Sequence, residues 1–386
     1  MSRQLLFIPG PVTVSKEVLA AMATPLINHR GPEFSKLLTS VTEKLRPIFG
    51  TAGEIVLLGS SGTGALESAV TSSFSPGQKI LACPVGVFGK RLAAIARTWG
   101  LKVETIDTEA GAIVDPQVLA ARLTADRAHE IAGVLLTHNE TSTGVQHDMA
   151  AIARAIGDHP ATTIVDSVSG LGAVEFRTDD WRFDIVVTAV QKALGAPPGI
   201  AMLAVSQRAW ERIAGATGPR FYFDLLRARK FASDGQTPWT PPVSLIFALD
   251  TALDQYHAEG ARNVWARHAR NAYAIQAFAE GANLAVFSKP GAHSMTVVAL
   301  HVPAGIVAGD ILTELRERHG LIFGGGQDEL KGKIFRVGTM GAITPQEVFH
   351  ALETFETVLI AHGHQAKKGA GTAAAREILE GVIATR

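Results

Sequence analysis

The sequence predicts an α/β fold made of a large domain with a mostly parallel sheet covered by helices, and a smaller α+β domain. Short apolar runs alternate with amphipathic helical patterns between about residues 53 and 206. Strands spaced by helices in this way are typical of parallel sheets. A Pro-rich stretch, TPWTPPVS (237–244), then precedes a long helical pattern, after which the alternation of the chain changes.

The predicted strands of the large domain are short and almost wholly apolar, as buried parallel strands are. They are EIVLLG (54–59), KILACP (79–84), AGVLLTH (132–138), TTIVDS (162–167), DIVVTAV (184–190) and IAMLAVS (200–206). Between them, SGTGALESAVTSSF, FGKRLAAIARTWG and HDMAAIARAIG carry apolar residues at three- and four-residue spacing. That spacing predicts helices that cover the sheet.

The helical pattern that starts at Leu245 runs to about Gly281 and is predicted to contain the domain boundary. Beyond it, TVVALHV and KIFRVG are predicted strands, and DILTELRERHG and PQEVFHALETFETVLIAHG are predicted helices. We therefore predict a large domain over 15–255, a small domain formed by 1–14 and 256–365, and a C-terminal tail over 366–386.

Composition narrows the functional classes. The 386 residues are 47% hydrophobic, and 36 Lys and Arg balance 36 Asp and Glu, so no net charge draws in nucleic acid or an anionic membrane. Cys83 is the single cysteine, which excludes an internal disulfide and a cysteine-rich metal site and suits a reducing cytoplasm. No export signal or apolar run of about 18 residues is found, so no membrane partner is expected. No metal site is expected either.

Loops at the carboxyl ends of the strands are where open α/β sheets bind ligands. After EIVLLG comes Ser60-Ser61-Gly62-Thr63-Gly64, whose small residues let backbone amides approach an anion at the start of a helix. The segment matches neither the P-loop pattern nor the dinucleotide fingerprint. It is a candidate phosphate cup, and an ordinary capped turn is the alternative.

Two ionisable residues follow buried strands. Asp166 ends TTIV, where an unpaired carboxylate would cost several kcal/mol, so it needs a cationic partner. Lys192 follows DIVVTAV and enters the Gly- and Pro-rich segment QKALGAPPG. Each alone has a structural alternative, such as a helix cap or a hydrogen-bonded core acid for Asp166. Together with the cup, however, they supply what pyridoxal 5′-phosphate (PLP) requires: an amine for its aldehyde, an acid for its ring nitrogen and an anion site for its phosphate.

At this point the chain resembles the class V aminotransferases, especially the alanine–glyoxylate and serine–glyoxylate aminotransferase family. The matching segments follow the family order over nearly all of residues 4 to 362: PGPVTV, SSGTGALES, GVFGKR, HNETSTGV, VDSVSG, QKALGAPPG, TPWTP and FRVGTMG. The resemblance implies PLP fold-type I. It implies that Lys192 holds the cofactor, that Asp166 pairs with the pyridine nitrogen, and that Ser61, Gly62, Thr63 and Gln191 hold the phosphate.

Further roles come from the same resemblance. Phe88 would stack on the pyridine ring, which suits an aromatic face, and Thr141 would bond the ring hydroxyl. Thr237 and Thr240 would reach the phosphate across the interface of a homodimer. The remaining two positions concern the substrate: Arg336 would bind its α-carboxylate, a role that suits the planar guanidinium, and Gly10 in PGP would border its pocket.

The expected reaction is transamination between serine or alanine and a 2-oxo acid, glyoxylate or pyruvate, by a ping-pong mechanism. Two alternatives use the same scaffold. One is transamination from another donor, namely ureidoglycine, pyridoxamine or an aminophosphonate, and the other is a PLP lyase reaction. Cysteine desulfuration is disfavoured because Cys83 ends a predicted buried strand and the predicted mobile loop GLIFGGGQDELKGK (320–333) has no cysteine. A non-enzymatic scaffold is disfavoured by the retention of Lys192, Asp166 and Arg336, and a nicotinamide dehydrogenase by the missing fingerprint.

Overall fold

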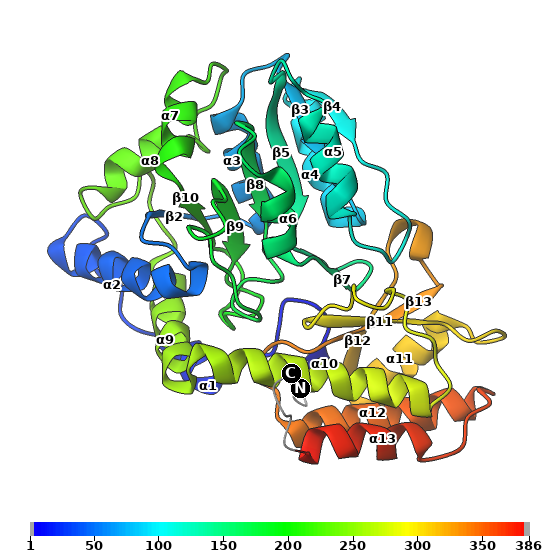
Figure 1. The fold of residues 1–386 in the computed structure, drawn as a ribbon. Helices are drawn as coiled ribbons and strands as arrows, with labels where there is room; N and C mark the ends of the chain where they lie inside the picture. The colour runs from blue at the N-terminus through cyan, green and yellow to red at the C-terminus, as the bar shows by residue number, and fades with distance from the viewer. Residues whose placement is uncertain (1–3, 382–386) are drawn as a thin grey trace.

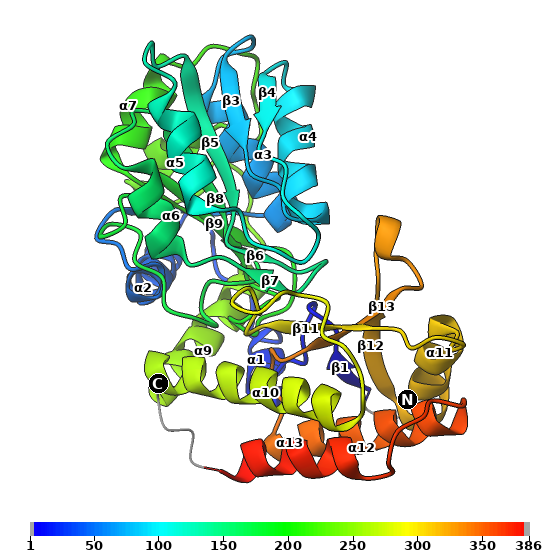
Figure 2. The ribbon, with the colours of Figure 1, turned by 45° about the vertical axis from the view of Figure 1, so that its right-hand side comes forward.

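The computed structural model describes residues 4–381, which build two main sheets joined by a pair of long helices, and a two-stranded hairpin (Figures 1 and 2). The larger sheet and its helices form one half of the molecule. The smaller sheet lies in the other half, beside the helices at the C-terminal end of the chain, as Figure 2 shows. The expected α/β architecture is confirmed.

The large sheet has seven strands in the order β2-β10-β9-β8-β5-β3-β4. Neighbours from β9 to β4 are parallel, whereas β10 runs antiparallel to both β2 and β9. The strands are β2 (Glu54–Leu58), β3 (Lys79–Ala82), β4 (Lys102–Thr105), β5 (Ile131–Thr137), β8 (Thr162–Asp166), β9 (Ile185–Ala189) and β10 (Ala201–Val205). All six predicted strands are present. The edge strand β4 was not predicted, because its sequence KVET has neither an apolar run nor clear alternation.

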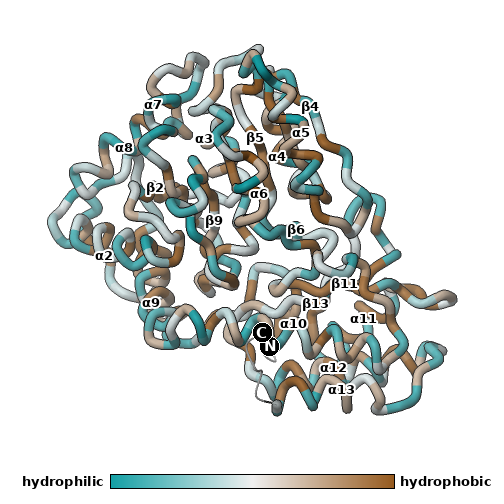
Figure 3. Tube along the Cα trace, viewed as in Figure 1, coloured by the Kyte–Doolittle hydropathy of each residue, from teal (hydrophilic) through white to brown (hydrophobic). Residues whose placement is uncertain are grey.

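Helices cover both faces of this sheet (Figure 1). They are α1 (Lys16–Ala21), α2 (Pro32–Phe49), α3 (Gly62–Ser73), α4 (Val87–Thr98), α5 (Pro116–Thr124), α6 (Met149–Ile156), α7 (Gln207–Gly215) and α8 (Leu225–Ala232). Figure 3 shows hydrophobic and hydrophilic residues alternating along helices such as α2, whose apolar positions are buried in the core. A short hairpin, β6 (Asn139–Glu140) and β7 (Val145–Gln146), follows β5.

The small sheet has the order β1-β12-β13-β11, so the N-terminal strand pairs with strands from the far end of the chain. Its strands are β1 (Leu5–Phe7), β11 (Val297–His301), β12 (Leu321–Gly325) and β13 (Ile334–Gly338). The helices of this half are α10 (Ala261–Gly281), α11 (Ala308–His319), α12 (Pro345–Ala361) and α13 (Ala370–Glu380), with the short 3₁₀ turn η1 (Asp328–Leu330).

The structure corrects two expectations. The single long helix is two helices, α9 (Val243–Glu259) and α10, separated at Gly260, whose φ of 84° breaks the helix. The first residues of the expected mobile loop 320–333 form β12, paired with both β1 and β13. The Gly-rich run 324–326 obscured this strand, since glycine is a poor sequence signal for a strand.

The last helix, α13, packs against α10 and α12 through small residues. A Cβ on Gly371 would lie 2.7 Å from Ala282 Cβ, so the helices approach closely. Buried Glu356 accepts hydrogen bonds from the amides of Gly369 and Gly371 and from the Thr372 hydroxyl at the start of α13. The division into domains itself stays a prediction, and residues 382–386 of the predicted tail lie outside the described residues.

Candidate active site

Five strands of the large sheet end at one edge, and the candidate residues follow those ends. Strands β2, β3, β5, β8 and β9 run in the same direction. The cup follows β2, the Phe88 loop follows β3, the Thr141 loop follows β5, Asp166 ends β8 and Lys192 follows β9. Parallel strands therefore gather residues that are far apart in the sequence.

The Lys192 amine contacts the N-terminal segment of the chain at Pro9. Its Nζ donates a hydrogen bond to the carbonyl oxygen of Pro9 at 2.7 Å. Burial lowers the pKa of Lys192 to about 8, the positive charge of Arg336 acts in the same direction, and the carboxylate of Asp166 opposes it. A side chain at Gly10 would reach 2.8 Å from Nζ, so this glycine leaves the space that the amine occupies. Near neutral pH, part of the Lys192 population is thus a free amine.

Asp166 is buried, with 5% of its surface exposed. Burial raises the pKa of its carboxyl group to about 6, while a hydrogen bond from the Val168 amide and the charge of Lys192 oppose the rise. A group in this range can carry or release a proton near neutrality.

The cup forms the N-terminus of α3. Ser61 caps the helix by accepting a hydrogen bond from the Gly64 amide. Gly62 packs against the segment that carries Asp166, because a Cβ there would lie 2.7 Å from Val168 Cγ2. Gln191, next to Lys192, has a buried side-chain oxygen, Oε1, with no hydrogen-bond partner. The helix terminus and its small residues make a polar recess suited to an anion, to which Gln191 could contribute only through its amide nitrogen.

Glu140 was missed by the sequence analysis and is fully buried. Its carboxylate accepts hydrogen bonds from the amides of Phe88 and Gly89 at the start of α4, and from the amide and hydroxyl of Ser142. It therefore fixes the Phe88 loop to the Thr141 loop. Glu140 lies within the segment HNETSTG, but the sequence does not show that its carboxylate reaches the Phe88 loop, because that contact depends on the tertiary structure.

Arg336 and Thr141 meet on the small-domain side of the site. Arg336 is 8% exposed and donates from Nε to the Gly325 carbonyl at 2.8 Å and from Nη1 to the Thr141 carbonyl at 3.2 Å. Nη1 also contacts Gln327 Oε1 at 3.3 Å. The Thr141 hydroxyl donates to Ser169 Oγ at 2.8 Å, three residues beyond Asp166. The structure thus brings Thr141 and Arg336 together beside the Asp166 segment.

Residues 14–331 match the family model described as Aminotransferase class-V. The chain belongs to the class V aminotransferase family. Its relatives include the L-aspartate–glyoxylate aminotransferase of Paracoccus denitrificans, which is 38% identical over 97% of this chain and 96% of that protein. Two further relatives are the soluble hydrogenase 42 kDa subunit of Anabaena cylindrica, at 38% identity over 97% and 98% of the two chains, and the serine–glyoxylate aminotransferase of Methylorubrum extorquens, at 35% over 98% and 96%.

Solved structures of aminotransferases share the whole fold. The pyridoxamine–pyruvate aminotransferase of Mesorhizobium loti has a TM-score of 0.93 at 30% identity, with 98% of each chain covered. The ureidoglycine–glyoxylate aminotransferase of Bacillus subtilis has a TM-score of 0.92 at 27% identity, with 99% of each chain covered. The protein is accordingly a PLP-family aminotransferase with fold-type I architecture.

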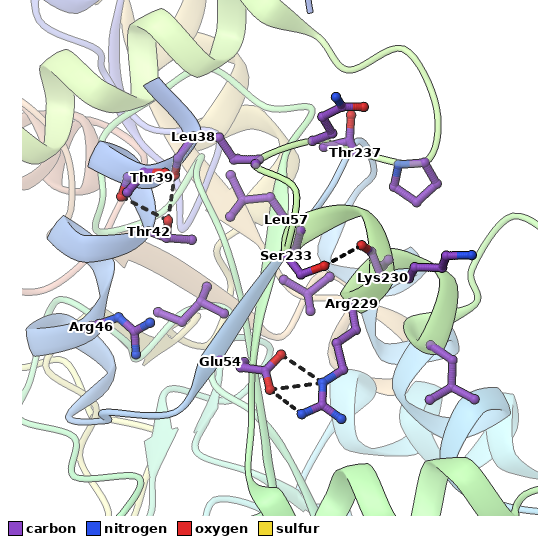
Figure 4. A pocket seen from close by; sticks show the side chains of 18 residues that line it. Leu38, Thr39, Thr42, Arg46, Glu54, Leu57, Arg229, Lys230, Ser233 and Thr237 are labelled. Carbon is purple, nitrogen blue, oxygen red and sulfur yellow. Dashed lines mark hydrogen bonds and ion pairs between the residues drawn. The ribbon is translucent and has the colours of Figure 1, made fainter. Parts of the chain in front are cut away.

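In this class V aminotransferase, the segment of Thr237 and Thr240 stands apart from the residues above. The Thr237 hydroxyl donates to the Trp239 carbonyl, and Arg30 donates to the Thr237 carbonyl. Thr237 also lines a cavity of about 600 Å³ between α2, β2 and α8, where Arg229 pairs with Glu54 (Figure 4). The described contacts within one chain do not connect Thr237 to the cup.

The Cys83 thiol lies in the core of the large half of the molecule. Burial raises the pKa of the Cys83 thiol to about 12, and the side chain is 2% exposed, so it is not a ready nucleophile. Among residues 4–381, no group of three or more His, Cys, Asp or Glu side chains is placed to hold a metal ion. The described helices include none that is both long and apolar enough to cross a membrane.

Proposed function

We propose that the protein binds PLP on Lys192 and transfers the amino group of a small amino acid to glyoxylate or pyruvate. The observation that carries the proposal is the position of Lys192, a buried amine with a lowered pKa that lies within electrostatic reach of both Asp166 and Arg336. An amine, an acid and a carboxylate-binding cation in one site are the groups that amino-group transfer needs.

The residues present fit the cofactor. The N-terminus of α3 at Ser61, Gly62 and Thr63 suits a phosphate group, and Gln191 would donate to it from its amide nitrogen. Phe88 would stack against the pyridine ring, and Thr141 would hold the ring hydroxyl. A flat, charged cofactor would thus have an aromatic face, an anion site and an acid for its nitrogen.

PLP, when bound, supplies an electron sink for the bond that breaks at the substrate Cα. Lys192, freed when substrate binds, would take the Cα proton and return it to the cofactor side. Its lowered pKa allows this at neutral pH. Asp166 would hold a proton on the ring nitrogen, and Arg336 would orient the substrate through its carboxylate. Gly10, which has no side chain, would leave room for the Lys192 amine.

The names of the relatives support glyoxylate or pyruvate as acceptor. They specify serine, aspartate, pyridoxamine and ureidoglycine as donors. Our proposal is serine or alanine, because Arg336 is the single buried arginine among residues 4–381 and suits a single α-carboxylate. Pyridoxamine, ureidoglycine and aspartate are the competing donors.

We also propose a homodimer in which Thr237 and Thr240 reach the phosphate of the partner subunit. Exposed aromatic side chains beside this segment support it: Phe221 is 66% exposed and Tyr222 49% exposed, and Tyr222 stacks on Trp239 with ring centroids 5.6 Å apart. Large exposed aromatic clusters are typical of protein interfaces.

The test is a panel of donors mixed singly with the PLP-loaded protein, followed by quantification of each 2-oxo product after a single turnover. Serine or alanine should be converted, and later addition of glyoxylate or pyruvate should yield the corresponding new amino acid. Arg336→Ala should bind PLP but convert no donor at low concentration. Conversion of pyridoxamine, ureidoglycine or aspartate alone would replace the proposed donor, and conversion of none would contradict the proposal.

A further inference from the structure

We infer that Arg91 is a cationic component of the phosphate site, a role that rests on the proposed function. Arg91 belongs to α4, three residues after Phe88, so both side chains project from the same face of that helix. The sequence analysis used the segment GVFGKR for Phe88 and gave Arg91 no role. The structure gives it contacts with two separate parts of the cofactor site.

The first contact is with the ring expected to stack on the cofactor. The Arg91 guanidinium carbon lies 4.7 Å from the centroid of the Phe88 ring. A guanidinium over an aromatic face is attracted to the ring and stacks on it. Phe88 therefore fixes the plane of the guanidinium and limits where its N–H groups can point.

The second contact is with the cup. Arg91 Nη1 donates to Thr63 Oγ1 at 3.4 Å, and Thr63 is the second residue of α3. The side chain thus bridges the start of α4 and the start of α3. The remaining N–H groups of the guanidinium stay available for a phosphate oxygen, since Arg carries five donors.

A bound phosphate needs more positive charge than the cup itself supplies. A phosphate ester carries close to two negative charges at pH 7, whereas a helix N-terminus supplies only about half a positive charge. Ser61, Gly62 and Thr63 are neutral. The Lys192 amine donates its hydrogen bond to the Pro9 carbonyl oxygen and not to the cup. Arg91 brings a full positive charge to the cup.

Arg91 is also not engaged by an anion of the protein. Among residues 4–381 it forms no ion pair with a carboxylate, whereas its neighbour Lys90 pairs with Glu329 at 3.4 Å. The positive charge of Arg91 reaches the site, because it contributes to lowering the pKa of Asp166 against the larger effect of burial. An exposed cation that contacts the cup and pairs with none of the described carboxylates is suited to bind an incoming anion.

The experiment compares PLP with pyridoxal, which lacks the phosphate. Affinities of the apoprotein for both are measured by absorbance titration in Arg91→Gln, Arg91→Lys and wild type. Arg91→Gln should bind PLP about 10-fold more weakly, because one charge-assisted hydrogen bond is lost at a partly exposed position. Its affinity for pyridoxal should be unchanged, and Arg91→Lys should fall between wild type and Arg91→Gln.

Inorganic phosphate gives a second readout that needs no catalysis. It should compete with pyridoxal phosphate binding in wild type and do so more weakly in Arg91→Gln. Arg97→Gln, an exposed arginine of the same helix, is the matched control and should leave all affinities unchanged. Thermal melting of each apoprotein checks that the variants fold.

The outcomes separate the two proposals. An equal loss of PLP and pyridoxal affinity in Arg91→Gln would overturn the inference, because it would mean that Arg91 acts only through the Phe88 ring. Unchanged PLP affinity would overturn it too. If the wild type itself shows no Lys192-dependent PLP binding, the proposed function fails, whereas normal wild-type binding with an unaffected Arg91 variant leaves that function intact.

Discussion

Replacing Asp166 with Asn should make the apoprotein more stable while greatly slowing amino-group transfer. Burial raises the pKa of this carboxyl group from 3.8 to about 6, and this net value already includes the favourable attraction of Lys192. A difference of about two pKa units corresponds to about 3 kcal/mol of destabilisation when the group is ionised. Asn has the same shape and can still accept the hydrogen bond from the Val168 amide.

The pH dependence follows from the direction of the shift. Because the folded pKa is above the unfolded one, the destabilisation is fully present above about pH 6 and disappears as the pH falls below 3.8. Asp166→Asn should therefore exceed the wild type in free energy of unfolding by up to about 3 kcal/mol at pH 8 and by about half of that at pH 5.

The assay is urea unfolding of both apoproteins, followed by fluorescence between pH 5 and 8, together with visible absorbance after PLP is added. Asn cannot keep the ring nitrogen protonated, so the variant should bind PLP but transfer amino groups far more slowly. A variant that is less stable than wild type at every pH, with a gap independent of pH, would refute the reasoning about Asp166.

Three further changes test the surroundings of the site. Gly10→Ala places a Cβ 2.8 Å from Lys192 Nζ at a φ of +137°, so it should lose Lys192-dependent absorbance while its circular dichroism stays native. Glu140→Gln removes a buried acceptor of hydrogen bonds from Phe88 and neighbouring amides, and should lower the free energy of unfolding by about 1–3 kcal/mol in urea titrations; an unchanged value would contradict its anchoring role. Arg336→Lys loses the planar fork and should reduce kcat/KM by about 10- to 100-fold through KM, whereas a loss in kcat alone would argue against carboxylate binding.

The core of the large domain was predictable because each strand is a continuous apolar run. TTIVD and DIVVTAV are buried on both faces of the sheet, and such runs need little tertiary information to be recognised. The edge strand Lys102–Thr105 lacks this signal, since its residues are partly exposed. The pairing of Leu5–Phe7 with Leu321–Phe323 joins opposite ends of the chain and cannot be inferred from local pattern.

The candidate site was predictable where a residue follows a strand. Asp166 and Lys192 were found in this way, and the parallel sheet explains why they lie together. Glu140 and Arg91 were missed because their importance depends on which loop each side chain reaches across the sheet edge. The dimer, the roles of Thr237 and Thr240 and a cytoplasmic location stay predictions, because they concern contacts and surroundings beyond one chain.

The most direct test of the account is chemical trapping of the cofactor on the lysine. PLP is added to the purified wild-type protein and to Lys192→Ala, both are treated with borohydride to fix any cofactor bound through an amine, and the digested peptides are analysed by mass spectrometry. We expect a pyridoxyl group on the peptide that contains Lys192 and none in Lys192→Ala. A modified peptide that carries another lysine, or equal labelling of the two proteins, would contradict the central claim that Lys192 holds the cofactor.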